Sequence, residues 1–242
     1  MRRSGRGALA LPMCTLAVLA ALAQSAWGAP NPPGDIRLSA LPRACERAPT
    51  GAACEAASVR ALDAARAKLA LGPYLLPADF LRLAPARQWL ILANLDRAAY
   101  SLRPITGLSA TLNAIARRGA AARADPDPWP LLMSLHGQSQ IGFASNWAGG
   151  QPNALVAYYG WMYDDGYGSG NLDCRTPLAP GCWGHRQNIL AFSHAASLSM
   201  GAAAIRGAVS YALTVVETSR TAWPYSYTWA AAMADGAGAK QR

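Results

Sequence analysis

The stretch from residue 160 to residue 190 decides the fold: it reads GWMYDDG at 160–166, NLDC at 171–174 and GCWGHRQNIL at 181–190. Its first segment carries the acidic pair Asp164 and Asp165, and its last places His185 three residues after Cys182. A disulfide from Cys182 to Cys174 would fix the loop that delivers His185 to the start of a short helix. We therefore expect an imidazole that is held by a neighbouring carboxylate.

Such a carboxylate leaves three roles open for His185. It raises the pKa of the imidazole and fixes its tautomer, which suits a general base, a metal ligand or a structural hydrogen bond. The residue types alone do not choose among these roles.

The flanking sequence predicts an α+β fold. Apolar spacing and stop signals predict helices at 54–71, 86–102, 109–124, 152–166 and 184–192. Ser109 is the expected N-cap of the third helix, and Pro152 is expected in the first turn of the fourth. Two apolar runs, 198–205 and 209–216, flank Arg206-Gly207 and predict a β-hairpin. Helices followed by antiparallel strands are typical of α+β proteins.

Both ends of the chain beyond these elements read as irregular. Four prolines in residues 29–42 exclude a regular helix there and predict a linker. The tail after Trp229 is rich in alanine and glycine, and we expect it to fray.

Composition indicates a globular protein and excludes a disordered one. The chain has 242 residues, of which 52% are hydrophobic and 14% charged, so it can bury a sizeable core. Its formal net charge is +9, but the arginines are scattered and form no polybasic run. Nucleic acid is therefore not an expected partner. Anionic lipid or an anionic cell-envelope polymer is the kind of partner that this charge favours.

Residues 1–28 read as a secretory signal peptide. Arg2, Arg3 and Arg6 form a positive start, residues 8–23 are uncharged and apolar, and Ala26-Trp27-Gly28 is a small-x-small cleavage site. The apolar stretch has 16 residues and contains a proline, whereas a membrane-spanning helix needs about 20 residues. We expect cleavage after Gly28 and a secreted, extracellular or cell-envelope location.

The cysteines predict two disulfides. Four of the five follow the signal peptide, an even number in a chain bound for an oxidising compartment. Three pairings are possible, and we favour the two local ones, Cys45–Cys54 and Cys174–Cys182. A four-cysteine metal site is disfavoured, because neither pair has C-x-x-C spacing.

Three motifs, taken in order, resemble the bacterial secreted branch of the CAP superfamily, the SCP-like domain of cysteine-rich secretory proteins, antigen 5 and plant pathogenesis-related proteins. GHRQNIL at 184–190 is similar to the branch's G-H-R-x-N-I-L motif. NLDR at 94–97 with LRP at 102–104 is similar to its N-x-E-R…G-L-x-P pattern, and SNWA at 145–148 falls where the family has a G-E-N-I-A-like segment. The closing hairpin resembles the family's last two strands. The resemblance covers residues 86–220.

The resemblance implies a CAP-type α-β-α sandwich, with a small antiparallel sheet between helical layers. We accordingly expect a signal peptide at 1–28 and an N-terminal extension at 29–85 that holds a local disulfide and a helix. A CAP/SCP-like domain would follow at 86–222, and a C-terminal tail at 223–242.

The resemblance also implies a cleft in which two histidines and two glutamates can hold a divalent metal. Only His185 matches cleanly, with Asp164 or Asp165 near the position of one glutamate. Ser145 replaces the other glutamate, and the second histidine is missing. His136 could substitute from a different loop, so His185, Asp164 and His136 form a candidate zinc set.

Two functions from different classes follow. The first is a non-enzymatic extracellular binding module for a lipid or sterol-like ligand, or an envelope component; its candidate cleft residues are Asn146, Trp161, Trp183, Asp164, Asp165 and His185. The alternative is a hydrolase with His185 as general base, Asp164 or Asp165 orienting it, and Ser145 or water as nucleophile. No G-x-S-x-G elbow supports a serine nucleophile.

Overall fold

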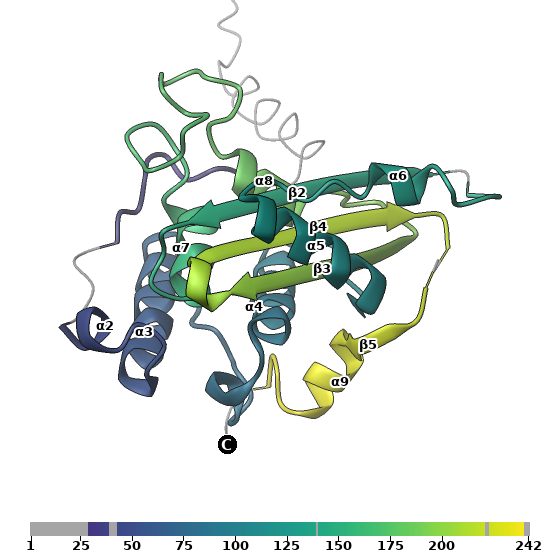
Figure 1. Cartoon of the computed structure of the whole chain (residues 1–242). Coiled ribbons are helices and arrows are strands. Elements are labelled where there is room, and N and C mark those ends of the chain that lie inside the picture. The colour runs from purple at the N-terminus through teal and green to yellow at the C-terminus, as the bar shows by residue number, and fades with distance from the viewer. Residues whose placement is uncertain (1–28, 39–42, 139, 221–222, 240–242) are drawn as a thin grey trace, which may run out of the picture.

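A computed structural model describes residues 29–38, 43–138, 140–220 and 223–239. The predicted signal peptide and its cleavage site lie outside the described residues. Five strands form one sheet in the order β2-β4-β3-β1-β5 (Figure 1). The strands span β1 Gly107–Ser109, β2 Ile141–Gly149, β3 Ser197–Ile205, β4 Ser210–Thr218 and β5 Tyr225–Thr228.

The predicted hairpin forms the centre of the sheet. β3 and β4 pair antiparallel from Ser197 opposite Thr218 to Ile205 opposite Ser210, and a short 3-10 turn, η3 Arg206–Ala208, joins them. β2 adds to the free edge of β4, also antiparallel. β1 pairs parallel with β3, and residues 110–196, whose described part holds four helices and β2, lie between the two strands. The sheet is therefore mixed, which corrects the expectation of a purely antiparallel one.

The five predicted helices form close to their expected bounds, as α3 Ala52–Lys68, α4 Pro85–Ala99, α5 Ala110–Ala122, α7 Ala154–Tyr163 and α8 Gly184–Leu190. Four short helical elements of the described residues were not predicted: α2 Arg43–Arg47, η2 Phe80–Arg82, α6 Trp129–Leu132 and α9 Trp229–Ala234. One detail differs from the prediction: Pro152 precedes α7, whose N-cap is Asn153. The Asn153 side chain accepts a hydrogen bond from the backbone N–H of Val156.

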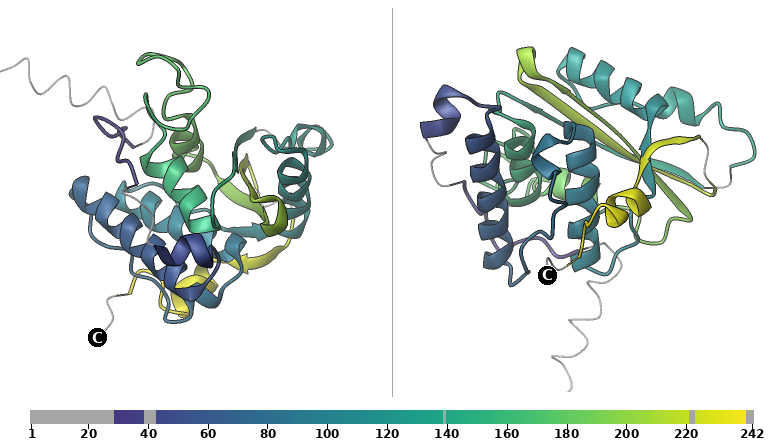
Figure 2. Two further views of the ribbon diagram at one scale, coloured as in Figure 1. Left: turned by 60° about the vertical axis from the view of Figure 1, so that its left-hand side comes forward. Right: turned by 90° about the horizontal axis from the view of Figure 1, so that it is seen from below.

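The elements form three layers, which confirms an α+β fold with helices around a small sheet. α5 and α6 cover one face of the sheet, while α4, α7 and α8 cover the other, with α3 outside α7 (Figure 2). Gly201 of β3 permits the close approach of α5. A Cβ atom there would come within 2.2 Å of the backbone of Leu112.

The described parts of both ends, residues 29–38 and 230–239, pack onto the domain, contrary to the predicted linker and frayed tail. In the lead-in, Ile36 is buried and its N–H donates to the carbonyl of Tyr163 at 2.8 Å. Beyond Trp229, helix α9 buries Ala232, and the N–H of Gly238 donates to the carbonyl of Leu75. Buried apolar surface and paired backbone groups outweigh the composition of these segments.

A buried polar network joins α3 to α4 and α7. Asp96 of α4 is fully buried and forms an ion pair with Arg66 of α3. Its carboxylate also accepts hydrogen bonds from the hydroxyls of Tyr74 at 2.6 Å, Tyr158 at 2.7 Å and Tyr163 at 3.1 Å. Arg66 and Tyr74 thus share one buried carboxylate with two tyrosines of α7. The segment that contains α3 and Tyr74 is therefore an integral part of the domain.

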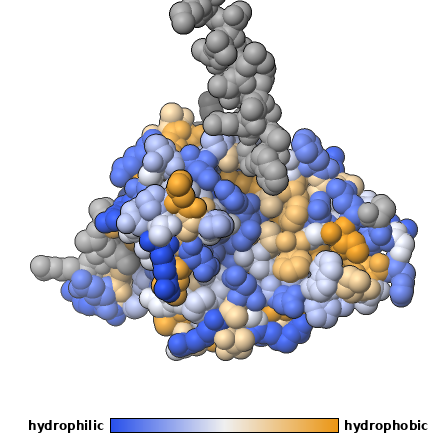
Figure 3. Space-filling view, turned by 90° about the horizontal axis from the view of Figure 1, so that it is seen from above, coloured by the Kyte–Doolittle hydropathy of each residue, from blue (hydrophilic) through white to orange (hydrophobic). Residues whose placement is uncertain are grey.

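Most of the large exposed hydrophobic side chains of the described residues lie in two places. Trp129, Met133 and Phe143 lie on and around α6 and β2, and Tyr167, Leu172 and Leu178 lie on the loop between α7 and α8; Val209 and Met233 lie elsewhere. The face in Figure 3 shows separate hydrophobic patches divided by hydrophilic residues. Within the described residues, no helix has the length and hydropathy needed to cross a bilayer.

Candidate functional site

Two disulfides have the predicted local pairing. Cys45 is joined to Cys54, and Cys174 to Cys182, with Cα atoms 4.7 and 4.4 Å apart. The second bridge closes the loop between α7 and α8, immediately before His185. Disulfides of this kind are typical of proteins from oxidising compartments.

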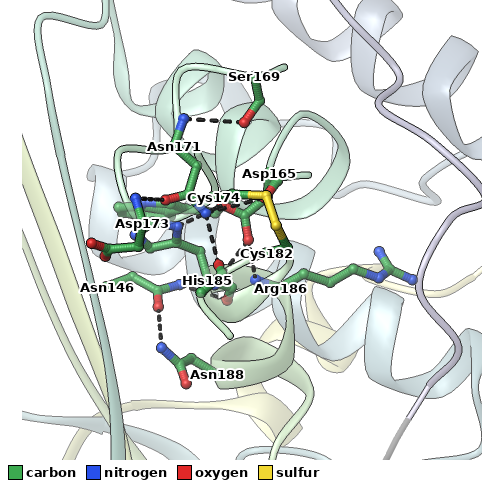
Figure 4. Close-up of polar contacts among 12 residues, drawn as sticks. Asn146, Asp165, Ser169, Asn171, Asp173, Cys174, Cys182, His185, Arg186 and Asn188 are labelled. Carbon is green, nitrogen blue, oxygen red and sulfur yellow. Dashed lines mark hydrogen bonds and ion pairs between the residues drawn. A yellow bond between two sulfur atoms is a disulfide. The ribbon is translucent and has the colours of Figure 1, made fainter. Parts of the chain in front are cut away.

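The predicted contact between an imidazole and a carboxylate forms between His185 and Asp165 (Figure 4). The Nδ1–H of His185 donates to Oδ1 of Asp165 at 2.6 Å, and the backbone N–H of His185 donates to Oδ2 at 2.9 Å. The carboxylate therefore fixes the tautomer, and it leaves Nε2 with the free lone pair when the ring is neutral.

Asp165 is itself held from two sides. The side-chain amide of Asn171 donates to Oδ1 of Asp165 at 2.8 Å and to the carbonyl of Gly181 at 2.9 Å, so it ties the two ends of the loop together. The backbone N–H of Arg186 also faces Oδ2 of Asp165 at 3.3 Å. With four donors, this buried carboxylate is a rigid anchor for the imidazole.

The remaining residues of GHRQNIL fix α8 in place. The guanidinium of Arg186 is buried and donates to the carbonyl of Met162, and Asn188 donates to the carbonyl of Ser145 on β2. Arg97 of α4 donates to the carbonyls of Ile189 and Ala191 at the end of the helix. Of the motif residues, only His185 contributes a side chain to the candidate site, whereas Arg186 and Asn188 hold α8 in position.

Three carboxylates act on the charge of His185. Burial lowers its pKa, but the hydrogen bond and charge of Asp165, with the charges of Asp125 and Asp173, outweigh burial and raise the pKa above its ordinary 6.5. Burial raises the pKa of Asp125, and the charge of His185 lowers it in part. The imidazole therefore lies in an acidic surrounding.

His185 lines a cavity of about 680 Å³. Residues after α5, the end of β2, one side of α7 and the disulfide loop form its walls. Its charged lining residues are Arg123, Asp125, Asp164, Asp165, Asp173 and His185, and its large apolar ones are Leu38, Trp147, Val156, Tyr159, Trp161, Leu172 and Val209. The volume falls in the range typical of small-molecule sites.

The cavity brings together four of the six predicted cleft residues: His185, Asp164, Asp165 and Trp161. The other two, Asn146 and Trp183, are not part of its lining. Asn146 is buried beneath α8, where its amide donates to the carbonyl of His185. Trp183 packs against Gly166 in a left-handed conformation with φ 63° at the N-cap of α8. Both residues are supports of the loop and helix.

Ser145 is excluded as the partner of His185. Side chains alternate between the two faces of a strand, so Ser145 points away from the face on which Asn146 contacts α8. Its hydroxyl donates to Oγ1 of Thr214 on β4 at 2.9 Å, and it does not line the cavity. A hydrolase at this site would have to use water as the nucleophile.

The candidate zinc set does not assemble. His136 is exposed in the segment between α6 and β2 and is absent from the cavity lining. Within the described ranges, no three His, Cys, Asp or Glu residues are grouped so that they could hold a metal ion. Nδ1 of His185 is also occupied by Asp165. The residues present therefore do not fit the metal site that the resemblance implies.

The structure adds cavity residues that the sequence did not single out as a site, chiefly Arg123, Asp125, Trp147 and Tyr159. Asp125 belongs to the Asp-Pro repeat after α5, and its carboxylate accepts a hydrogen bond from the backbone N–H of Trp147. The bond joins two segments that are far apart in the sequence, so local sequence patterns do not predict it. The one local signal is the Asp-Pro-Asp-Pro sequence, which indicates a rigid loop at this position.

Comparison of the chain with protein-family models, curated proteins and solved structures gave no match. The resemblance to the CAP superfamily therefore rests on the sequence motifs and their order.

Proposed function

We propose that this chain is a secreted bacterial protein of CAP type that acts as a non-enzymatic binding module for a small amphipathic ligand, of the lipid or sterol-like class. The cavity carries the proposal. It combines an apolar wall from Trp147, Val156 and Trp161 with a polar end around His185, as sites for small organic ligands do. The two disulfides and the predicted signal peptide support an extracellular location.

A glycine in the cavity wall supports this function. Gly160 lies inside α7, where glycine costs about 1 kcal/mol relative to alanine. A Cβ atom at this position would meet nothing within 4 Å, so packing against the protein does not require glycine. The absence of a side chain leaves the cavity unfilled at this point. A destabilising glycine that packing does not require is consistent with a cavity that accommodates a ligand.

The test is native mass spectrometry of the protein purified from a secreting host, before and after organic extraction. We expect an extractable organic adduct on the wild-type protein and none on Gly160→Leu, whose side chain fills the cavity. Gly207→Leu is the matched control, because Gly207 also has open space around its Cβ direction but lies on the β3–β4 turn. An adduct that survives Gly160→Leu, or a wild-type protein without any adduct, contradicts the proposal.

The bond between His185 and Asp165 favours a second candidate function, a hydrolase. An imidazole oriented by a carboxylate and facing a cavity can take a proton from water through Nε2, a contribution of about 10²–10⁴ in rate. A panel of chromogenic esters tests this. Hydrolysis that falls at least about 100-fold in His185→Gln and is unchanged in Ser145→Ala supports the enzyme; equal rates for the wild type and His185→Gln exclude it.

A further inference from the structure

The charge of the cavity is opposite to that of the whole chain. Four of its six charged lining residues are aspartates, whereas the chain as a whole carries a net charge of +9. Arg123 and a protonated His185 leave the lining with a net charge of about −2.

Two of the four aspartates, Asp125 and Asp173, are exposed where they line the cavity and are available to a ligand. Asp165 is saturated by His185, Asn171 and Arg186. By contrast, Asp125 and Asp173 form no ion pair within the part of the chain that the structure describes, and both carboxylates lie close enough to His185 to act on its charge. Asp164 also lines the cavity, but its Oδ1 is buried, and the charge of Arg37 and the backbone N–H of Leu38 act on its carboxylate.

The rest of the wall suits the same kind of ligand. Trp147, Tyr159 and Trp161 contribute aromatic surface to the cavity, and aromatic faces attract organic cations. Leu38, Val156 and Val209 add aliphatic surface that can cover a hydrocarbon body. The lining therefore combines surface for an apolar body with the exposed carboxylates of Asp125 and Asp173.

We propose that the ligand carries a cationic head group, an amine or a quaternary ammonium, which binds beside Asp125 and Asp173, while its apolar body lies against the aromatic and aliphatic wall. This inference rests on the proposed binding function and specifies the ligand class. A carboxylate or phosphate head is disfavoured, because it would meet these aspartates at close range.

Isothermal titration with three probes of equal tail length tests the inference: dodecyltrimethylammonium, an uncharged dodecyl maltoside and dodecyl sulfate, each below its micelle concentration. We expect the cationic probe to bind at least about tenfold more tightly than the uncharged one. The basic surface of the chain would attract the anionic probe instead, so a preference for the cation has to arise in the cavity.

The double variant Asp125→Asn/Asp173→Asn should lose most of the tenfold preference and still bind the uncharged probe. Asp127→Asn is the matched control: Asp127 is exposed in the same loop and outside the cavity lining, and asparagine can still accept the hydrogen bond from the N–H of Trp129. If the cationic and uncharged probes bind with equal affinity and Gly160→Leu blocks both, the proposed cationic head group is wrong but the proposed binding function stands. If none of the three probes binds, both proposals are wrong. If the anionic probe is preferred and the double variant keeps that preference, the proposed cationic head group is also wrong.

Discussion

His185 takes its properties from the carboxylates around it, so the pH dependence of stability tests its surroundings. Because its pKa in the folded protein is raised above 6.5, the imidazolium stabilises the fold fully below about pH 6.5. That contribution is lost as the pH rises through the raised pKa. We therefore expect the melting temperature of the wild type to fall relative to that of His185→Gln between pH 6 and pH 9. Parallel melting curves across this range would show that the three aspartates do not act on the ring.

Asp96 makes the second prediction at this scale. It is fully buried with Arg66 and three tyrosine hydroxyls, so Asp96→Asn leaves a buried guanidinium without its counter-charge. Breaking one partner of a buried pair costs about 3 kcal/mol or more. Urea denaturation should show this loss, whereas the exposed Asp127→Asn should change stability by less than about 0.5 kcal/mol. A loss of similar size in both variants would refute the role of the network.

The same substitution in two elements should have opposite effects. Gly160→Ala in α7 adds a methyl group into open space and removes a helix-interior glycine, so we expect a gain of about 0.5–1 kcal/mol. Gly201→Ala in β3 places its Cβ within 2.2 Å of the backbone of α5, so we expect a loss of about 1–3 kcal/mol. Thermal and urea unfolding of both variants measures the difference. Stabilisation by both would mean that α5 does not lie as closely on the sheet as described.

Elements with a strong local signal were predicted, and those that depend on distant pairing were not. The periodicity of residues 86–102 and the turn at Arg206-Gly207 correctly predicted α4 and the β3–β4 hairpin. β1 has three residues and β5 has four, so neither shows a pattern of its own. The same difference holds in the site. The disulfide loop that presents His185 is local in sequence, while Asp125 reaches the cavity from the end of α5 on the other side of the sheet edge.

At the scale of the whole molecule, the segment before residue 86 packs into the same domain as the motif-bearing part of the chain. The motifs that resemble the CAP superfamily begin after residue 86, yet residues before that point supply buried groups to α4 and α7. Arg66 pairs with Asp96, and the carbonyl of Ile36 accepts a hydrogen bond from the hydroxyl of Tyr159 at 2.7 Å. The described parts of the 29–85 segment therefore pack against α4 and α7, and Leu38 of this segment also lines the cavity.

Deletion of residues 29–72 tests this integration. It removes Arg66 and the buried apolar side chains of α3, which leaves Asp96 as a buried charge and exposes the side of α7 that α3 covers. The broken ion pair alone costs about 3–5 kcal/mol of the roughly 5–15 kcal/mol that stabilises a typical domain. The lost apolar burial adds to this cost, so we expect no cooperative melting transition by circular dichroism. A chain that begins at Gly34 is the control, since among polar contacts it loses the hydrogen bond from Arg186 to the carbonyl of Pro30 and keeps α3. A deleted chain that melts as cooperatively as the control would show that the segment is a separable extension after all.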